Sequence, residues 1–391
     1  MAGSFERRCW AEVDLDILRQ NFKWIQQAAG GTPAMAVVKA DAYGHGDVAV
    51  ARTLQAAGAA GFAVSCFAEA MRLRRGGIQK PVLILGYTEP ALAGRLAAEG
   101  LHQCVFSAGY ARLLSQRAVE AGVRVDAHFK IETGMGRLGF NAKDDMAAAV
   151  EELAGACRLP GLAPVGLFSH FAVADSARPG DIAYTEGQYA LLLQVRQALG
   201  ALGIGFQTTH ICNSAGLVAH GYMHLDMVRP GIILYGCAPS AEAALPGLAP
   251  VLQLKTVVTQ VKTLQKGDCI SYGRTFTAPG PMRVATLAAG YADGYNRLLS
   301  GRGVVGIHGQ SAPVLGRVCM DQCVADVSAI PGVEMGDVAT LFGGGGADST
   351  EQAAEKCGTI SYEILCGLTR RVQRVYRENG EETQTEDYMQ E

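Results

Sequence analysis

Along the first 240 residues, short apolar runs alternate with longer segments whose apolar residues recur every three or four positions. Short continuous apolar runs are typical of strands buried on both faces, and the longer spacing is typical of helices that cover a sheet. The runs predict strands at 34–39, 61–66, 81–85, 103–107, 125–131, 165–170, 208–212 and 225–229. The longer segments predict helices at 14–29, 47–57, 108–121, 142–154 and 185–202.

Eight strands that alternate with helices are the number that a (β/α)8 barrel requires. A doubly wound sheet is the alternative for such an alternation, and it usually has fewer strands. We therefore predict an α/β fold with a TIM-type (β/α)8 barrel over residues 1–240, in which the helix at 14–29 packs at the barrel edge or against a second domain.

The pattern changes after about residue 240, where Gly and Pro pairs separate short runs rich in Val and Thr. Such runs with tight turns predict antiparallel strands. We expect a mostly antiparallel β domain over 241–376, closed by one helix at 349–367, and a loosely ordered polar tail over 377–391. The expected strands are 252–264, 283–287, 304–307, 312–318, 325–327 and 338–342.

Composition narrows the classes of function. The 391 residues carry a net charge of −3 with no runs of Lys and Arg, so we expect no nucleic-acid partner. No apolar run approaches the roughly 18 residues of a membrane helix, and no signal-peptide stretch follows the N-terminus. Together with eleven scattered cysteines, this predicts a cytoplasmic location without a membrane partner. No cluster has the spacing of metal ligands, so we expect no catalytic metal.

Polar residues end several of the predicted barrel strands. The first strand ends in Lys39, the fifth carries Lys130, the sixth ends in His170 and the eighth ends in Arg229. A single polar strand end is usually a solvated or paired side chain. The active sites of such barrels, however, lie at the carboxyl ends of the strands, so we expect these side chains to converge on one site.

Two loops indicate that the site binds an anion. Phosphate sites in barrels often use the loops after the seventh and eighth strands, which here contain Asn213-Ser214 and Pro230-Gly231. A lysine beside a phosphate site is what a pyridoxal phosphate enzyme requires, because the amine bonds to the cofactor and the phosphate anchors it. Burial would lower the pKa of the lysine and help it to act as a nucleophile and base.

The motifs that contain these residues resemble, in their order along the chain, those of the alanine racemase family. The resemblance extends from about Trp10 to Arg374. The motifs are AVVKADAYGHG at 36–46, KIETGMGR at 130–137, SHFA at 169–172, NSA at 213–215, MVRPGI at 227–232, ISYGRTF at 270–276, GYADGY at 290–295 and GRVCMD at 316–321.

The resemblance implies a pyridoxal 5'-phosphate barrel, a C-terminal β domain and a head-to-tail homodimer with composite active sites. It implies that Lys39 holds the cofactor and is one catalytic base, while Tyr272 reaches the partner's cofactor as the other. Arg229 would face the pyridine nitrogen. The phosphate would be held by Tyr43, Ser214, Gly231 and Ile232, with Asn213 and His170 also in the cofactor site.

The same resemblance implies a substrate-binding set. Arg137 would lie near the cofactor's ring oxygen and the substrate carboxylate, held by Lys130, which is carbamylated in many members. The backbone N–H of Met320 would meet the substrate carboxylate beside Asp321, and Tyr291 would line the entrance.

The implied reaction is racemisation of a small amino acid, L-alanine to D-alanine, which supplies peptidoglycan. Racemisation requires that one proton leave one face of Cα and another arrive on the opposite face, which two bases accomplish directly. A free tyrosine has a pKa near 10. We expect the positive field of His170 and Arg229 to help Tyr272 to act as a base.

Three alternatives remain at this point. Arg370 stands where many alanine-specific relatives carry a tyrosine and serine-racemising relatives linked to vancomycin resistance carry a smaller polar residue, so serine, or both amino acids, is the rival substrate. A non-catalytic pyridoxal phosphate carrier would be a single domain and would lack the β domain with Tyr272. A decarboxylase of related architecture would lack the ISYGRTF motif.

Overall fold

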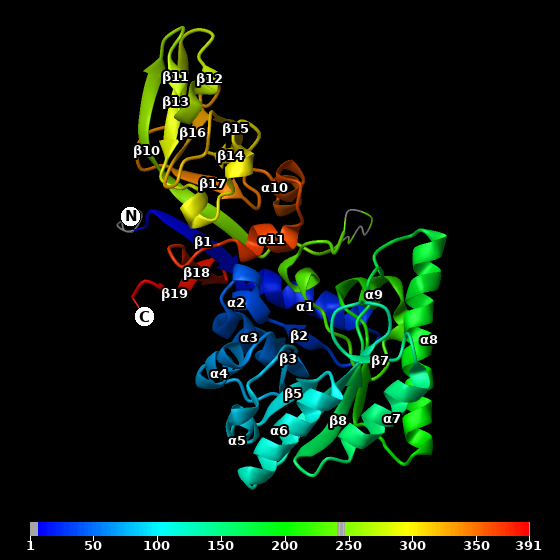
Figure 1. Cartoon of the computed structure of the whole chain (residues 1–391). Coiled ribbons are helices and arrows are strands. Elements are labelled where there is room, and N and C mark those ends of the chain that lie inside the picture. Colours follow the sequence, from blue (N-terminus) through cyan, green and yellow to red (C-terminus); the bar gives the residue numbers. More distant parts are fainter. Residues whose placement is uncertain (1–6, 241, 243–244, 246, 391) are drawn as a thin grey trace.

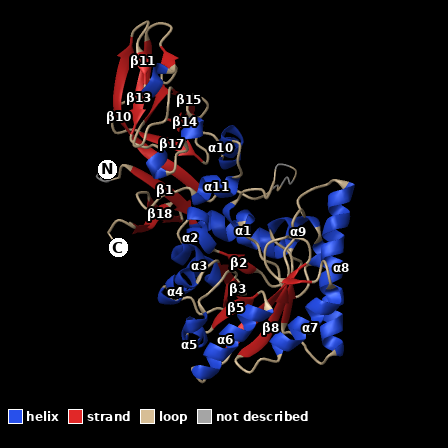
Figure 2. Cartoon of the chain, in the orientation of Figure 1, coloured by secondary structure: helices blue, strands red, loops and turns tan. Residues whose placement is uncertain are grey.

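The computed structural model describes residues 7–240, 242, 245 and 247–390. The chain forms a barrel of parallel strands and, beside it, a second domain built on a larger sheet; the first and last described strands both lie in that second domain (Figure 1). Figure 2 shows that helices surround the strands of the barrel, whereas strands predominate in the second domain. Among the described residues, no helix has both the length and the apolar character needed to cross a bilayer.

The barrel strands follow one another in sequence order, each parallel to the next. Their residues are almost all buried, as expected for a parallel sheet covered by helices. The strands are β2 (Met35–Val37), β3 (Gly61–Val64), β4 (Val82–Ile84), β5 (Leu101–Val105), β6 (Val125–Glu132), β8 (Leu162–Phe168) and β9 (Thr208–His210), with β7 (Phe140–Asn141) beside β6. The helices around them are α3 (Asp47–Ala56), α4 (Phe67–Arg75), α5 (Ala93–Ala98), α6 (Ala108–Glu120), α7 (Met146–Cys157) and α8 (Pro179–Ala201).

The eighth predicted strand, at 225–229, is reduced to two isolated bridges. Met227 pairs with His210 and Val228 pairs with Ala34, both in parallel. The segment stays short because Leu225 has a left-handed backbone, with φ of 56°, and Pro230 has no N–H to donate. The two bridges nonetheless connect β9 to the residue before β2 and so close the barrel. The predicted barrel is therefore confirmed, with an eighth strand reduced to these two bridges.

The second domain is a nine-stranded sheet in the order β13-β16-β15-β14-β17-β10-β1-β18-β19, and the long strand β10 also pairs with β13. This confirms the predicted β domain. Its strands are β1 (Cys9–Asp14), β10 (Leu252–Leu264), β13 (Met282–Leu287), β14 (Val304–Ile307), β15 (Gln310–Leu315), β16 (Cys323–Asp326), β17 (Val338–Phe342), β18 (Gln373–Glu378) and β19 (Glu381–Glu386), and a small hairpin joins β11 (Cys269–Ile270) to β12 (Phe276–Thr277).

The first strand corrects the predicted domain boundary. Strand β1 lies inside the C-terminal sheet, antiparallel to β10 and parallel to β18, although it precedes the barrel in sequence. Asp14 ends β1 and caps α1 (Leu15–Ala28), accepting hydrogen bonds from the N–H groups of Asp16 and Ile17 at 2.9 Å. From β1 in the C-terminal sheet, the chain therefore crosses directly into the barrel domain.

The C-terminal end also differs from the prediction. The tail expected over 377–391 forms β19, which pairs antiparallel with β18, and the following Tyr388 is buried. The sequence pattern did not predict this strand, because it has no alternation of apolar residues. Backbone pairing with β18 and the ion pairs Arg7–Glu382 and Arg72–Glu386 hold it instead. The single helix expected at 349–367 is two helices, α10 (Thr350–Cys357) and α11 (Ser361–Cys366), since Gly358 ends the first with φ of 69°.

Candidate active site

The polar strand ends meet at one cavity of about 780 Å³ at the carboxyl ends of the barrel strands. The predicted residues from both the strand ends and the two anion-binding loops line it. They are Lys39, Tyr43, Lys130, Arg137, His170, Asn213, Ser214, Arg229, Gly231 and Ile232. Four of them are lysines or arginines, which suits an anionic ligand.

Lys39 is the first residue of α2 (Lys39–Gly44), directly after the buried strand β2. Its amine is largely removed from water, and this burial, together with the nearby guanidinium of Arg137, lowers the pKa of Lys39. A lysine with a lowered pKa carries more neutral amine near neutrality and is a better nucleophile.

The turn that follows Lys39 winds in the left-handed sense. Residues 40–43 all have φ between 51° and 56°, although none is glycine. This conformation costs roughly 1–2 kcal/mol for each L-residue, so contacts elsewhere must hold it. One is the carboxylate of Glu69, which accepts from the N–H of Ala40 at 2.8 Å. The sequence gives only a weak signal for this turn, because αL positions are usually recognised by Gly, Asn or Asp, and Asp41 alone of these four residues is of that kind.

The left-handed turn aims Tyr43 at the predicted anion loops. A Cβ on Gly231 would lie 2.8 Å from the Tyr43 hydroxyl, so only glycine leaves room for the ring. The Gly231 N–H donates to the Ser214 hydroxyl at 2.9 Å. Asn213 caps α9 (Ser214–Ala219) by accepting from the N–H of Gly216, and Ile232 opens a short 3-10 helix, Ile232–Tyr235. These groups form a polar cradle beside the tyrosine hydroxyl.

Arg229 lies buried on the barrel axis side of the cavity. Its guanidinium donates to the carbonyl oxygens of Ser169 at 2.7 Å and Ile211 at 3.0 Å and to Nδ1 of His210. It also lies 3.3 Å from Nδ1 of His170. Arginine only donates, so both imidazoles must present an unprotonated Nδ1 to it.

A chain of histidines continues from Arg229 through the barrel interior. Nε2 of His210 lies 3.0 Å from Nδ1 of His128, and Nε2 of His128 lies 3.0 Å from Nδ1 of His102. Burial lowers the pKa of His128 to about 3 and that of His210 well below its usual value, so both are neutral near pH 7. Each ring therefore donates its Nε2 proton to the next ring. The chain fixes the acceptor that holds Arg229, and sequence reasoning missed it.

The sequence reasoning on His170 needs a correction. Burial, and then the cations Arg229 and Arg137, hold the pKa of His170 well below its usual value, so this imidazole is neutral and supplies no positive field. The pKa of Arg229, although burial lowers it to about 10, still leaves the guanidinium charged at neutral pH. Of His170 and Arg229, only Arg229 carries a positive charge at neutral pH.

Lys130 and Arg137 also line the cavity. Burial is the main cause that lowers the pKa of Lys130 to about 8. Arg137 is placed by the loop after β6, where the carboxylate of Glu132 accepts from the N–H groups of Gly134 at 2.5 Å and Arg137 at 3.1 Å. Gly134 has φ of 137°, a conformation that the loop requires and that glycine provides.

The remaining predicted residues lie outside this cavity. Tyr272 stands on a 3-10 turn (Tyr272–Arg274) of the β domain and is 74% exposed. Tyr291 and Met320 are exposed on the same domain, and Asp321 accepts from the guanidinium of Arg371 at 2.8 Å. Arg370 donates to the carbonyl of Tyr388 at 2.9 Å. Within the described residues of one chain, the structure does not bring this set to Lys39.

The fold and the cavity together define a class, that of two-domain barrel enzymes with a strand-end lysine beside an anion cradle. Comparison with known families identifies the family within this class. Residues 13–239 match the N-terminal domain of alanine racemase, and residues 251–376 match its C-terminal domain. The chain belongs to the alanine racemase family, whose members are isomerases.

Individual relatives are similar over nearly the whole chain. An alanine racemase of Clostridium perfringens (strain SM101 / Type A) is 43% identical over 387 residues, covering 98% of this chain and 99% of its own. One from Desulforamulus reducens is 42% identical, covering 94% and 98%. Among solved structures, alanine racemase of Clostridium difficile 630 superposes with a TM-score of 0.90 at 34% identity, covering 98% and 99%. That of Bacillus anthracis with bound L-Ala-P gives 0.89 at 34%, covering 98% of each chain.

The neutral histidine chain predicts an acid-sensitive fold. An unfolded histidine has a pKa near 6.5, whereas burial lowers the pKa of His128 to about 3. The unfolded chain therefore binds a proton here that the folded chain does not. As the pH falls from about 6.5 toward 3, His128 alone should reduce the free energy of unfolding by about 1.4 kcal/mol per pH unit.

The variant His128→Gln can still donate and accept hydrogen bonds but does not titrate. The slope of the unfolding free energy against pH should therefore fall by the contribution of about one proton. Urea unfolding at several pH values between 6.5 and 4 measures the slope. Replacement of exposed Gln27 by Ala is the control and should keep the original slope. An identical slope in His128→Gln and the unchanged protein would show that His128 is protonated in the fold.

Proposed function

We propose that this protein is a pyridoxal 5'-phosphate-dependent alanine racemase that converts L-alanine to D-alanine for cell-wall peptidoglycan. The observation that carries the proposal is the position of Lys39, whose amine of lowered pKa opens into the same cavity as the polar cradle of Tyr43, Ser214 and Gly231. Family membership and the names of the relatives support the same reaction.

The residues present fit the cofactor. A phosphate suits the cradle, because the hydroxyl-bearing residues Tyr43 and Ser214 line the cavity beside Gly231, whose lack of a Cβ leaves room for the tyrosine. Lys39 would hold the cofactor covalently and Arg229 would face its ring nitrogen, with Arg137 near its ring oxygen and Asn213, Ile232 and His170 around it. When bound, the cofactor supplies an electron sink that makes the Cα–H of an amino acid acidic.

The protein's own groups then control where protons go. Lys39, neutral in part because burial disfavours its charged form, accepts the proton on one face of Cα. Arg229 keeps its proton at neutral pH and cannot pass it to the ring nitrogen, because its pKa stays near 10. Arg229 would therefore leave the ring nitrogen of a bound cofactor unprotonated, which would discourage side reactions such as transamination.

The second base comes from a second copy of the chain. Tyr272 is largely exposed on the β domain of its own chain, and Tyr291 and Met320 are exposed on the same domain. This exposure leaves the three side chains available for contact with a second subunit. In a head-to-tail homodimer, Tyr272 of each subunit reaches the opposite face of Cα in the other, Met320 and Asp321 meet the substrate carboxylate, and Tyr291 lines the entrance.

Alanine is the substrate that the relatives favour. Those compared above all carry the name alanine racemase, so the serine alternative gains no support from them. Arg370 does not line the cavity of its own chain and bonds to the C-terminal tail instead, so nothing in that cavity supports its predicted role in substrate choice. The two-domain match leaves the single-domain carrier without support.

The test of this function is the loss of optical activity of L-alanine with purified protein loaded with pyridoxal phosphate. We expect circular dichroism to decay to zero without release of carbon dioxide. We also expect kcat/KM for L-alanine to exceed that for L-serine, by less than about 100-fold, because a pocket rejects an added hydroxyl only weakly. No decay with either amino acid would contradict the function, and a larger kcat/KM for serine would contradict the substrate.

We further propose that Lys130 is carbamylated. With a pKa of about 8, roughly half of its amine is neutral at pH 8 and can attack carbon dioxide, forming an N–C bond and releasing one proton. The resulting anion would replace a positive charge that lies near Arg137. Protein equilibrated with carbon-13 bicarbonate should show a carbamate signal that Lys130→Met abolishes. A signal that persists in this variant, or none in the unchanged protein, contradicts the assignment.

A further inference from the structure

We propose that Tyr388, in the C-terminal tail, is a positioning residue for the cofactor lysine. With Arg374 it holds the left-handed turn between Lys39 and Tyr43 from the side opposite the cavity. The importance of the turn for catalysis rests on the proposed function, whereas the contacts themselves do not. The match to the C-terminal family domain ends at residue 376, so Tyr388 lies beyond it.

Asp41, in the middle of the left-handed turn, is where the tail makes contact. Its two carboxylate oxygens each lie 2.9 Å from the hydroxyl of Tyr388. One of them also lies 3.4 Å from the guanidinium of Arg374, and the other accepts from the N–H of Asp47 at 3.1 Å. Asp41 thus joins the turn to the tail, to β18 and to the start of α3.

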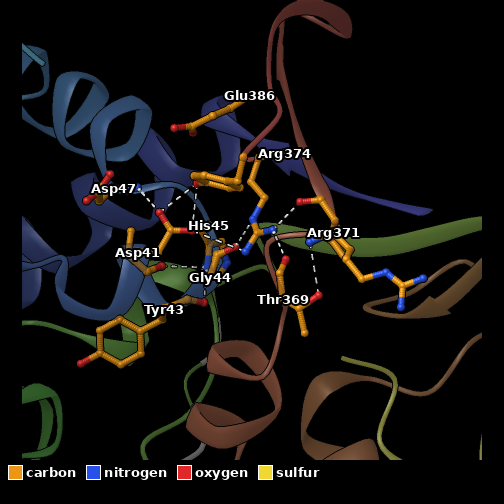
Figure 3. A network of polar contacts seen from close by, with 12 residues as sticks. Asp41, Tyr43, Gly44, His45, Asp47, Thr369, Arg371, Arg374 and Glu386 are labelled. Carbon is orange, nitrogen blue, oxygen red and sulfur yellow. Dashed lines mark hydrogen bonds and ion pairs between the residues drawn. The ribbon is translucent and has the colours of Figure 1, made fainter. Parts of the chain in front are cut away.

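Arg374 holds the end of the same turn. It is a β18 residue with 2% of its surface exposed, and its Nε donates to the carbonyl of Gly44 at 2.9 Å. Its Nη1 donates to the carbonyl of Thr369 at 3.1 Å, in the loop before β18. Figure 3 shows Arg374 lying between Asp41 and Gly44 on one side and Thr369 on the other. A single buried guanidinium therefore ties the turn to the β domain.

The ring of Tyr388 is itself held in place. The guanidinium carbons of Arg72 and Arg374 lie 5.0 and 5.1 Å from its centroid, so the ring sits against two cations. Glu386 accepts from the hydroxyl of Tyr376 at 2.6 Å and pairs with Arg72, which also contacts Asp47 at 2.6 Å. The tail is thus fastened to α3 and α4 as well as to β18.

The residues after the turn are packed so closely that a side chain larger than glycine does not fit there. A Cβ on Gly46 would overlap the hydroxyl of Tyr376, and a Cβ on Gly44 would overlap the carbonyl of Leu365. The turn is therefore packed directly against the C-terminal segment. Because Asp41 stands two residues from both Lys39 and Tyr43, a shift at Asp41 moves the amine and the phosphate cradle together.

The test uses Tyr388→Phe, which keeps the ring against the two guanidinium groups and removes only the hydroxyl bonded to Asp41. Met389→Ala, at a neighbouring residue that is 67% exposed, is the matched control. We expect the dissociation constant of pyridoxal phosphate to rise about tenfold in Tyr388→Phe, since a hydrogen bond to a charged group is lost. We also expect the visible absorbance of the bound cofactor to shift and kcat to fall more than KM changes.

A double-mutant cycle with Asp41→Asn identifies the partner. If Tyr388 acts through Asp41, adding Tyr388→Phe to Asp41→Asn should change the cofactor dissociation constant little further. A role in overall stability alone would lower the unfolding midpoint and leave cofactor affinity, absorbance and the ratio of kcat to KM as they are. That result, or equal effects of Tyr388→Phe in both backgrounds, would overturn the proposal.

A measurement without cofactor separates this proposal from the proposed function. Amide hydrogen exchange over residues 40–46 of the cofactor-free protein should be about tenfold faster in Tyr388→Phe than in Met389→Ala. Unchanged exchange would overturn the positioning role even if the protein racemises alanine. Faster exchange in a protein that neither binds the cofactor nor racemises alanine would support the contact and contradict the function instead.

Discussion

Four consecutive left-handed residues at positions 40–43 require support that local sequence does not supply, and the arrangement of the two domains follows from that requirement. The turn follows β2 of the barrel and is held by Glu69 of α4, yet its other side-chain contacts come from Arg374 in the C-terminal sheet and Tyr388 in the tail. Strand β1 places that sheet beside the barrel from the first residues of the fold. The strained turn and the domain interface therefore stabilise one another, and Lys39 and Tyr43 face the cavity together as a result.

The electrostatics of the cavity follow from burial. Arg229 keeps its charge in the barrel because carbonyl oxygens and neutral imidazoles surround it, and those imidazoles stay neutral because they are buried beside a cation. The same burial lowers the pKa of Lys39 and Lys130. A cavity with this cationic balance suits an anionic ligand. In the proposed reaction Lys39 would serve one face of the substrate carbon, and the exposed Tyr272 of a second subunit would serve the other.

The sequence predicts much of this arrangement, because strand ends in a barrel converge wherever the alternation of strands and helices is clear. Lys39 and Arg229 were identified in that way, and family motifs added Tyr272. The rest depends on contacts between distant segments. Strand β1 is six residues long, too short for its pattern to name a partner sheet. The His128 chain is formed from three strands, and Tyr388 lies in a polar tail whose order comes from pairing with β18.

The central claim is that a complete site combines Lys39 of one subunit with Tyr272 of another. Lys39→Ala and Tyr272→Phe proteins, each inactive alone, can be mixed, dissociated and reassociated, with native mass spectrometry to count the mixed dimers. Each mixed dimer contains one site with both intact residues, so random mixing should restore about a quarter of the original racemase activity. Mixed dimers that form in the expected proportion but remain inactive would contradict the claim.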